Sequence, residues 1–139
     1  MLVRDRMSKP AVTIRSDTDY KAALRAMEKN SLHHLPVLDA GGKLVGMAAE
    51  RDLLVAATRY LQSDVEVGDI MHRGLVTTHP GMSLASAARL MARERIGGLP
   101  VIDDAGALVG IITETDILMA FAEFDRPPSW PPDSPRFPE

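Results

Sequence analysis

The sequence predicts an α/β (α+β) fold built from two copies of one small unit. Residues 3–54 align without a gap on residues 67–118, and 19 of these 52 pairs are identical at an offset of 64. In each copy a short apolar run, a helical pattern, two apolar runs around a turn and a second helical pattern follow one another. The predicted order is therefore β-α-β-β-α, twice. A unit this short buries its apolar faces poorly, so we expect the two copies to pair.

Each copy begins with a strand and a helix. The strands are predicted at residues 11–14 and 75–78, and the helices at residues 20–29 and 84–93, where apolar residues recur at helical spacing. Asp19 and Ser83 stand just before the helices. Their side-chain oxygens can accept hydrogen bonds from the first free amides, so we expect them to be N-caps.

A hairpin and a second helix complete each copy. The hairpin turns are predicted at residues 39–42 and 103–106, where glycine permits a positive φ. The second helices are predicted at residues 51–61 and 115–124. Gly46 and Gly110 stand inside strand patterns, where glycine often marks the close approach of another backbone segment.

Residues 125–139 form a different segment, because they hold six of the ten prolines. Proline lacks the amide hydrogen that helices and sheets use, so we expect this tail to be extended or disordered, with Trp130 as a candidate anchor. The predicted organisation is one repeat at 1–62, a second repeat at 63–124 and the proline-rich tail at 125–139.

Composition and missing motifs exclude several classes of function. The 139 residues contain no cysteine and carry a net charge of −3 without a basic block, which argues against disulfides, cysteine-ligated metals and a nucleic-acid surface. No secretory signal and no apolar run long enough to span a membrane are present, so we expect a cytoplasmic protein with no membrane partner. The histidines lack metal spacing, and neither a phosphate-cradling glycine motif nor a nucleophile elbow is present. We therefore expect no metal site, no required cofactor and no enzymatic activity.

Two phrases carry a resemblance to a known family. They are HLPVLD at 34–39 followed by LVG at 44–46, and GLPVID at 98–103 followed by LVGIITETD at 108–116. Over residues 3–122 the chain resembles the CBS-domain family, as a stand-alone pair of the bacterial type. The resemblance implies two repeats packed sheet to sheet with pseudo-two-fold symmetry into one Bateman module, and a homodimer formed through the module's helices. It also implies clefts between the repeats that bind AMP, ADP, ATP, S-adenosyl methionine or NAD.

In the family, the Thr and Asp of a Gly-x-x-Thr-x-x-Asp phrase face the ribose of the ligand, which implies ribose contacts from Thr113 and Asp116. A carboxylate can accept hydrogen bonds from both ribose hydroxyls. The same pattern before an apolar run is also typical of a helix cap, and spacing alone does not separate the two interpretations. The first copy has Ala49 in place of the threonine, so we expect only a second, weaker site at Asp52.

The resemblance also implies contacts for the rest of a nucleotide. The phosphate would be met by His33, His34 and Arg51, and the adenine by Thr78, His79, Ile96, Gly97, Gly98 and Leu99. The histidines can equally be ordinary loop residues, and the apolar members of the adenine set are more often residues of a core.

The function expected from this reasoning is a non-catalytic regulatory module. It would bind an adenine nucleotide between the repeats, as an energy sensor does, and transmit binding to an unidentified regulated protein by a conformational shift. Two alternatives stay open: a sensor of S-adenosyl methionine or NAD(H), and a dimerisation or interaction scaffold that binds no nucleotide. The loss of the threonine at Ala49 favours the scaffold.

Overall fold

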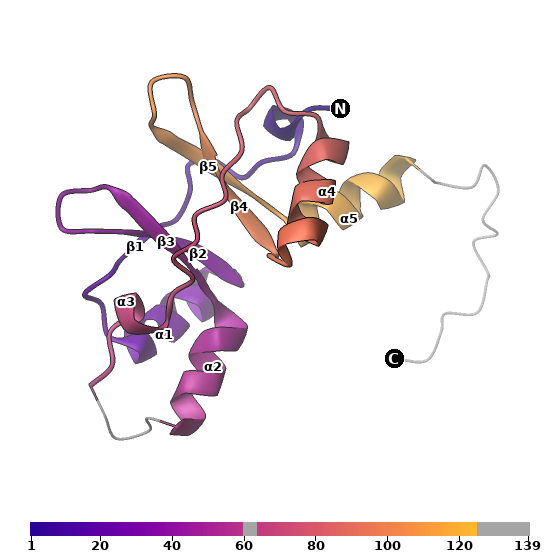
Figure 1. The fold of residues 1–139 in the computed structure, drawn as a ribbon. Helices are drawn as coiled ribbons and strands as arrows, with labels where there is room; N and C mark the ends of the chain where they lie inside the picture. The colour runs from indigo at the N-terminus through magenta and orange to yellow at the C-terminus, as the bar shows by residue number, and fades with distance from the viewer. Residues whose placement is uncertain (60–63, 125–139) are drawn as a thin grey trace, which may run out of the picture.

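The computed structural model describes residues 1–59 and 64–124, which form two α/β units (Figure 1). The first unit contains β1 (Ile14–Arg15), α1 (Tyr20–Asn30), β2 (His34–Leu38), β3 (Leu44–Ala49) and α2 (Glu50–Arg59). The second contains α4 (Leu84–Glu94), β4 (Gly98–Ile102), β5 (Leu108–Thr113) and α5 (Glu114–Phe124). A 3₁₀ turn, η1 (Val3–Asp5), and the short α3 (Val67–Ile70) precede them. The predicted tail with Trp130, and the end of the helix predicted at 51–61, lie outside the described residues.

The two sheets share one hairpin geometry and lie between the helices of the two units (Figure 1). In the first sheet β1 runs parallel to β2, which pairs antiparallel with β3. In the second sheet β4 and β5 pair antiparallel in the equivalent register, so that His34 faces Ala49 and Gly98 faces Thr113. The mixed α/β architecture expected from the sequence is confirmed.

The first strand of each repeat is shorter than the sequence predicts. The strand predicted at 11–14 is displaced to Ile14–Arg15. The strand predicted at 75–78 is reduced to a single parallel bridge between Thr78 and Val101. The residues just before Thr78 line the space between the units instead of pairing with β4, which leaves only one residue in ladder geometry.

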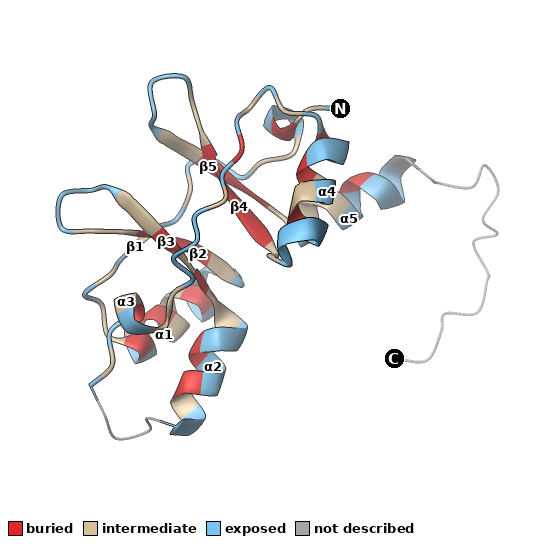
Figure 2. Cartoon of the chain, viewed as in Figure 1, coloured by how far each residue is buried: buried red, intermediate tan, exposed pale blue. Residues whose placement is uncertain are grey.

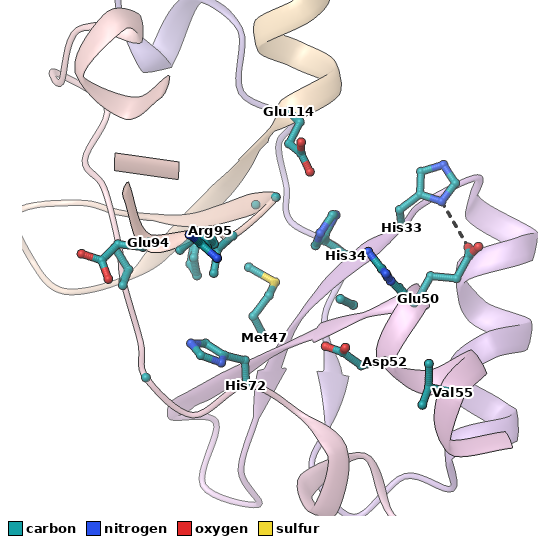
Figure 3. Close-up of a pocket in the computed structure, with 18 of the residues that line it drawn as sticks. His33, His34, Met47, Glu50, Asp52, Val55, His72, Glu94, Arg95 and Glu114 are labelled. Carbon is teal, nitrogen blue, oxygen red and sulfur yellow. Dashed lines mark hydrogen bonds and ion pairs between the residues drawn. The ribbon is translucent and has the colours of Figure 1, made fainter. Parts of the chain in front are cut away.

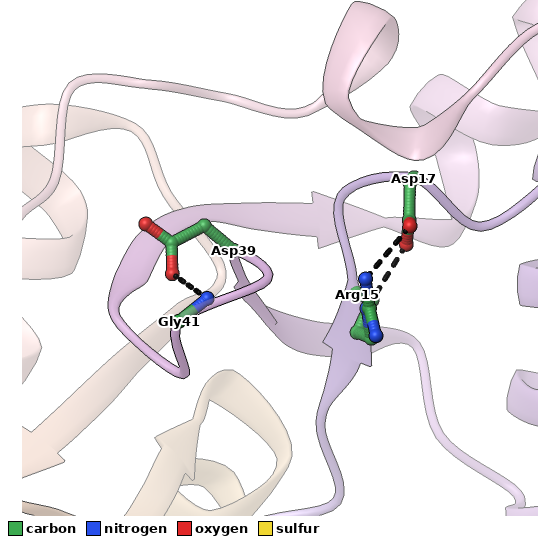
Figure 4. A network of polar contacts seen from close by, with 4 residues as sticks. All are labelled: Arg15, Asp17, Asp39 and Gly41. Carbon is green, nitrogen blue, oxygen red and sulfur yellow. Dashed lines mark hydrogen bonds and ion pairs between the residues drawn. The ribbon is translucent and has the colours of Figure 1, made fainter.

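The predicted caps and turns are confirmed. The Asp19 carboxylate accepts a hydrogen bond from the Lys21 amide at 2.8 Å, and the Ser83 hydroxyl accepts one from the Ser86 amide at 3.1 Å. In the first hairpin the Asp39 carboxylate accepts a hydrogen bond from the Gly41 amide at 2.9 Å, near the Arg15–Asp17 ion pair (Figure 4). The next residue, Gly42, has a φ of 85°, a conformation that glycine adopts without strain.

The segment that leads into each repeat packs on the other repeat. Ser8 exchanges two backbone hydrogen bonds with Ile111 of β5, at 2.9 and 3.0 Å. The equivalent residue of the second repeat, His72, exchanges two with Met47 of β3, also at 2.9 and 3.0 Å. Figure 1 shows the N-terminal turn beside α4 and β5, although it belongs to the first repeat in sequence. The exchange ties the two units together.

Each unit has its own core, and an exchanged residue completes it. Val3 is 0% exposed in the second core, among Met91, Leu99 and Ile112, which carry the inner faces of α4 and the sheet. Val67 is 0% exposed in the first core, where it packs with Tyr20, Met27 and Leu53. Figure 2 shows the buried residues on the inner faces of helices and strands in both units.

The two strand glycines mark the places where the exchanged segments lie, as the sequence predicts. A β-carbon added at Gly110 would lie 2.6 Å from the carbonyl oxygen of Ser8. A β-carbon at Gly46 would lie 2.8 Å from the carbonyl oxygen of His72. Both distances are far shorter than a carbon–oxygen contact, so any side chain here would displace the exchanged segment.

Candidate functional site

A cleft of about 820 Å³ opens between the two units (Figure 3). On the first unit its wall is formed by the start of β2, the end of β3 and most of α2. On the second unit the wall is formed by the end of α4, the start of β4 and the connection around residues 72–76. A cleft of this size, formed by both repeats, is large enough for a nucleotide-sized ligand.

The cleft gathers residues from three of the groups predicted from the sequence. His33, His34 and Arg51 were expected at a phosphate, and Asp52 at a weaker site. Three residues expected at an adenine join them from the second repeat, namely Ile96, Gly97 and Gly98.

Five other predicted residues do not line this cleft. They are Thr78, His79, Leu99, Thr113 and Asp116. Leu99 is fully buried in the second core, and Thr78 is 3% exposed, with its hydroxyl donating a hydrogen bond to the sulfur of Met82 at 3.0 Å. Both side chains are therefore buried in the second unit and not available to a ligand in the cleft.

Thr113 and Asp116 are joined by a helix cap. Oδ2 of Asp116 accepts hydrogen bonds from the backbone amide of Thr113 at 2.8 Å and from its hydroxyl at 3.0 Å. The contact to the amide is the one that the acidic residue of a capping box makes at a helix start. The structure thus shows the capping interaction that the sequence left open, here at the start of α5.

The equivalent carboxylate in the first repeat is not held in this way. Ala49 has no hydroxyl, and among residues 1–59 and 64–124 the side chain of Asp52 has no hydrogen-bond partner. Asp52 lies in the first turn of α2 and lines the cleft (Figure 3). Its carboxylate oxygens are therefore available to the hydroxyl groups of a ligand.

The cleft holds a cluster of imidazole and carboxylate groups. A β-carbon added at Gly97 would lie 2.8 Å from Nε2 of His34 and would also meet Oε1 of Glu114. Burial lowers the pKa of His34 below its ordinary value of 6.5, and the neighbouring Glu114 carboxylate opposes this shift. His34 is therefore uncharged at neutral pH. Beside it, Nδ1 of His33 lies 3.2 Å from Oε2 of Glu50.

Sequence reasoning missed Glu114 and Arg95, which both line the cleft. Glu114 is the partner of Glu50 at the offset of 64, and each opens a helix beside the predicted ribose carboxylate. The backbones of the two residues make equivalent hydrogen bonds. The Glu50 amide donates to the His33 carbonyl at 2.8 Å, and the Glu114 amide donates to the Gly97 carbonyl at 3.0 Å. This symmetry was the signal for Glu114, whereas no pattern marked Arg95.

A second surface feature lies on α2 and α5. Their exposed apolar residues occur partly at equivalent positions of the two repeats: Leu54, Val55, Leu118, Met119 and Phe121. Leu118 is 66% exposed and Phe121 64% exposed. Exposed apolar side chains that form a contiguous patch are more typical of an interface than of a solvated surface.

Two further classes of site are unsupported by the part of the chain that is described. No helix within 1–59 and 64–124 combines the length and the apolar character needed to cross a membrane. The same residues hold no group of three or more histidine or acidic side chains placed to bind a metal ion.

Comparison with known proteins gives consistent matches. The family model for the CBS domain matches twice, over residues 3–59 and 67–123. A CBS domain-containing protein of Dictyostelium discoideum is 37% identical over 129 residues, covering 85% of this chain and 89% of its own. The L-aspartate semialdehyde sulfurtransferase of Methanocaldococcus jannaschii is 35% identical over 120 residues, but these are only 23% of that enzyme.

Two solved structures share the fold. A CBS domain pair in complex with 5′-methylthioadenosine and S-adenosyl-L-methionine has a TM-score of 0.82 and 34% identity, covering 90% of this chain and 98% of that one. The CBS-pair protein CBSX2 of Arabidopsis thaliana, in complex with AMP, has a TM-score of 0.75 and 28% identity, with the same coverage.

Proposed function

The chain belongs to the CBS-domain family, and on that premise we propose that it is a non-catalytic regulatory module that binds an adenosine compound between its repeats. The observation that carries the proposal is the cleft, which both repeats line and in which the Asp52 carboxylate has no hydrogen-bond partner among the residues that the structure describes. Two structures of the same fold support the ligand class, since one was solved with AMP and the other with 5′-methylthioadenosine and S-adenosyl-L-methionine. The ligand is an adenine nucleotide (AMP, ADP or ATP) or a related compound such as S-adenosyl methionine or NAD(H).

We assign the ribose to Asp52. Its carboxylate has no partner within residues 1–59 and 64–124, borders the cleft and can accept hydrogen bonds from both ribose hydroxyls. The base then lies on the apolar wall formed by Leu75, Val76 and Ile96. Thr113 and Asp116 remain a candidate ribose pair for a second, pseudo-symmetric site. The cleft favours Asp52 as the main site, which reverses the order expected from the sequence.

Binding would act on a partner protein through a population shift. A ligand in the cleft touches both repeats and the connection around residues 72–76, so it stabilises one relative arrangement of the units. The size of the shift is limited by the difference in affinity for the two arrangements. The regulated partner would read the resulting surface.

The proposal is tested by the melting temperature of the full chain with adenosine, AMP, ADP, ATP, S-adenosyl methionine or NAD(H). A ligand that binds the folded state raises the melting temperature by mass action. We expect at least one compound to do so for the native chain and for Asp116→Ala, and none to do so for Asp52→Ala. If no compound shifts the native chain, or if Asp52→Ala responds as the native chain does, the proposed site is wrong.

An interaction scaffold is the second candidate, and the exposed apolar residues of α2 and α5 favour it. Equivalent positions such as Leu54 and Leu118 would present a self-complementary surface to a second copy of the chain. A homodimer formed in this way is compatible with ligand binding. Light scattering after size exclusion would give twice the chain mass for the native protein and the single mass for Leu118→Glu. A native protein that is monomeric at high concentration would remove this candidate.

A further inference from the structure

The proposed ligand cleft carries more negative than positive charge. Four carboxylates and two guanidinium groups line the cleft: Glu50, Asp52, Glu94, Glu114, Arg51 and Arg95. The imidazole of His34, between them, is uncharged at neutral pH because of its burial. It therefore does not cancel the carboxylate next to it.

Glu114 is the carboxylate placed to meet the ligand. In the described part of the chain its side chain has no hydrogen-bond or ion-pair partner, whereas Glu50 is paired with His33 and Glu94 with Arg93. Figure 3 shows Glu114 entering from the second unit, on the opposite side of His34 from Asp52. The charges of both carboxylates raise the pKa of His34, against the lowering that burial causes.

The position of Glu114 sets which part of the ligand it faces. With the ribose at Asp52 and the base on the apolar wall, the 5′ substituent is left to extend toward His34 and Gly97. A β-carbon at Gly97 would meet Oε1 of Glu114, so this carboxylate lies directly against the backbone there. A phosphate chain in that place would face the negative charge of Glu114, and because this side chain is exposed to solvent, the repulsion would be moderate.

The guanidinium of Arg95 is also without a partner among the described residues, and it lines the same cleft. An ammonium or sulfonium group of the ligand would form an ion pair with Glu114, and a carboxylate of the ligand would form one with Arg95. The α-amino acid end of an adenosylated sulfur compound carries these groups.

We propose that Glu114 selects the ligand by the charge of its 5′ substituent, so that adenosine compounds with a cationic or uncharged 5′-sulfur group bind more tightly than adenosine polyphosphates. This inference rests on the proposed function, because it assumes that the ribose lies at Asp52. It assigns Glu114 as a specificity-determining residue contributed by the repeat opposite the ribose site.

Calorimetric titration of the full chain with S-adenosyl methionine, 5′-methylthioadenosine, AMP and ATP tests the inference. The native chain should bind the two sulfur compounds more tightly than AMP, and AMP more tightly than ATP. Glu114→Gln should lower the affinity for S-adenosyl methionine and raise the affinity for ATP, each by about three- to ten-fold. The affinity for 5′-methylthioadenosine should not change. Glu28→Gln makes the same charge change on the exposed face of α1 and should alter no affinity.

Salt supplies a measurement that needs no variant. Raising the ionic strength should reduce the difference in affinity between S-adenosyl methionine and ATP, because salt screens the charges that cause this difference. The selection by Glu114 is refuted if the native chain binds ATP as tightly as S-adenosyl methionine, or if Glu114→Gln changes the affinity for neither ligand. Either result would leave the proposed adenosine site unaffected. If no adenosine compound binds, or if Asp52→Ala binds adenosine normally, the proposed function fails and the inference with it.

Discussion

The imidazole of His34 lies against the backbone of Gly98, which is its own counterpart in the other repeat. A β-carbon added at Gly98 would lie 3.2 Å from Cγ of His34, closer than an ordinary van der Waals contact. The two positions face each other across the pseudo-two-fold axis, so only one of them has room for a side chain. A histidine at both positions would therefore clash, and the two copies differ in sequence at this point.

The first prediction concerns this contact. Gly98→His should lower the free energy of unfolding by about 1–3 kcal/mol, because it overfills a closely packed site. The exchanged variant, His34→Gly with Gly98→His, should recover at least half of that loss, since the side chain then occupies the same space from the other repeat. Urea denaturation measures both. If Gly98→His is as stable as the native chain, the space next to Gly98 is not filled by His34.

The second prediction concerns the exchanged segments. Val3→Ala and Val67→Ala should each cost about 1–3 kcal/mol of unfolding free energy, since both valines are fully buried. Hydrogen exchange should locate the damage in the opposite repeat: in α4 and β5 for Val3→Ala, and in α1 and β3 for Val67→Ala. Loss of protection within the repeat that carries the substitution would contradict the exchange.

The third prediction separates capping from binding. Asp116→Ala should destabilise the fold by about 1 kcal/mol, because it removes the contact that caps α5. Asp52→Ala should change stability by less than about 0.5 kcal/mol, because its carboxylate has no partner within the described residues. Each variant is the control for the other in thermal denaturation. Equal losses of stability would show that Asp52 is a structural residue too.

The fourth prediction follows from Ala49. Ala49→Thr recreates in the first repeat the hydroxyl that contacts Asp116 in the second. It should stabilise the fold by about 0.5–1 kcal/mol and weaken adenosine binding, because the new hydroxyl competes for Asp52. Ala49→Val has nearly the same shape without the hydroxyl and serves as the control in the same titration. Stronger binding by Ala49→Thr than by Ala49→Val would mean that the threonine contacts the ligand.

The fifth prediction concerns pH. Burial lowers the pKa of His34 below 6.5, His33 adds to this shift, and Glu114, Asp52 and Glu50 oppose it. As the pH falls below 6.5 the unfolded chain takes up a proton that the folded chain does not, so the free energy of unfolding decreases. Between about pH 7.5 and about pH 5, His34→Asn should lose less stability than the native chain. Parallel pH profiles would exclude His34 as the titrating group.

Much of the fold could be predicted from the sequence, because the two copies repeat the same local signals. The caps at Asp19 and Ser83, the hairpin turns and the glycines at 46 and 110 each depend on a local rule that needs no tertiary knowledge. The exchange of leading segments could not be predicted. Val3 and Val67 carry the same pattern in both copies, so the sequence cannot show which core each one enters.

The candidate site was less accessible to prediction for a related reason. The pattern that ends at Asp116 fits a cap and a ribose site equally, and only the three-dimensional structure shows the hydrogen bonds of the cap. The site at Asp52 was expected to be the weaker one because its threonine is missing, yet that absence leaves the Asp52 carboxylate without a partner among the described residues. Arg95 lines the cleft because the chain turns into it at the end of α4. No sequence motif predicts the direction of that turn.

The exchange of leading segments also limits how this protein can be divided. A polypeptide cut between the repeats would give two halves, each lacking the valine that completes its core and the segment that covers its last strand. A lone repeat could complete itself only by borrowing the leading segment of another molecule. In the duplicated chain that partner is always present at high effective concentration, so what would be an association between two molecules becomes an intramolecular step of folding.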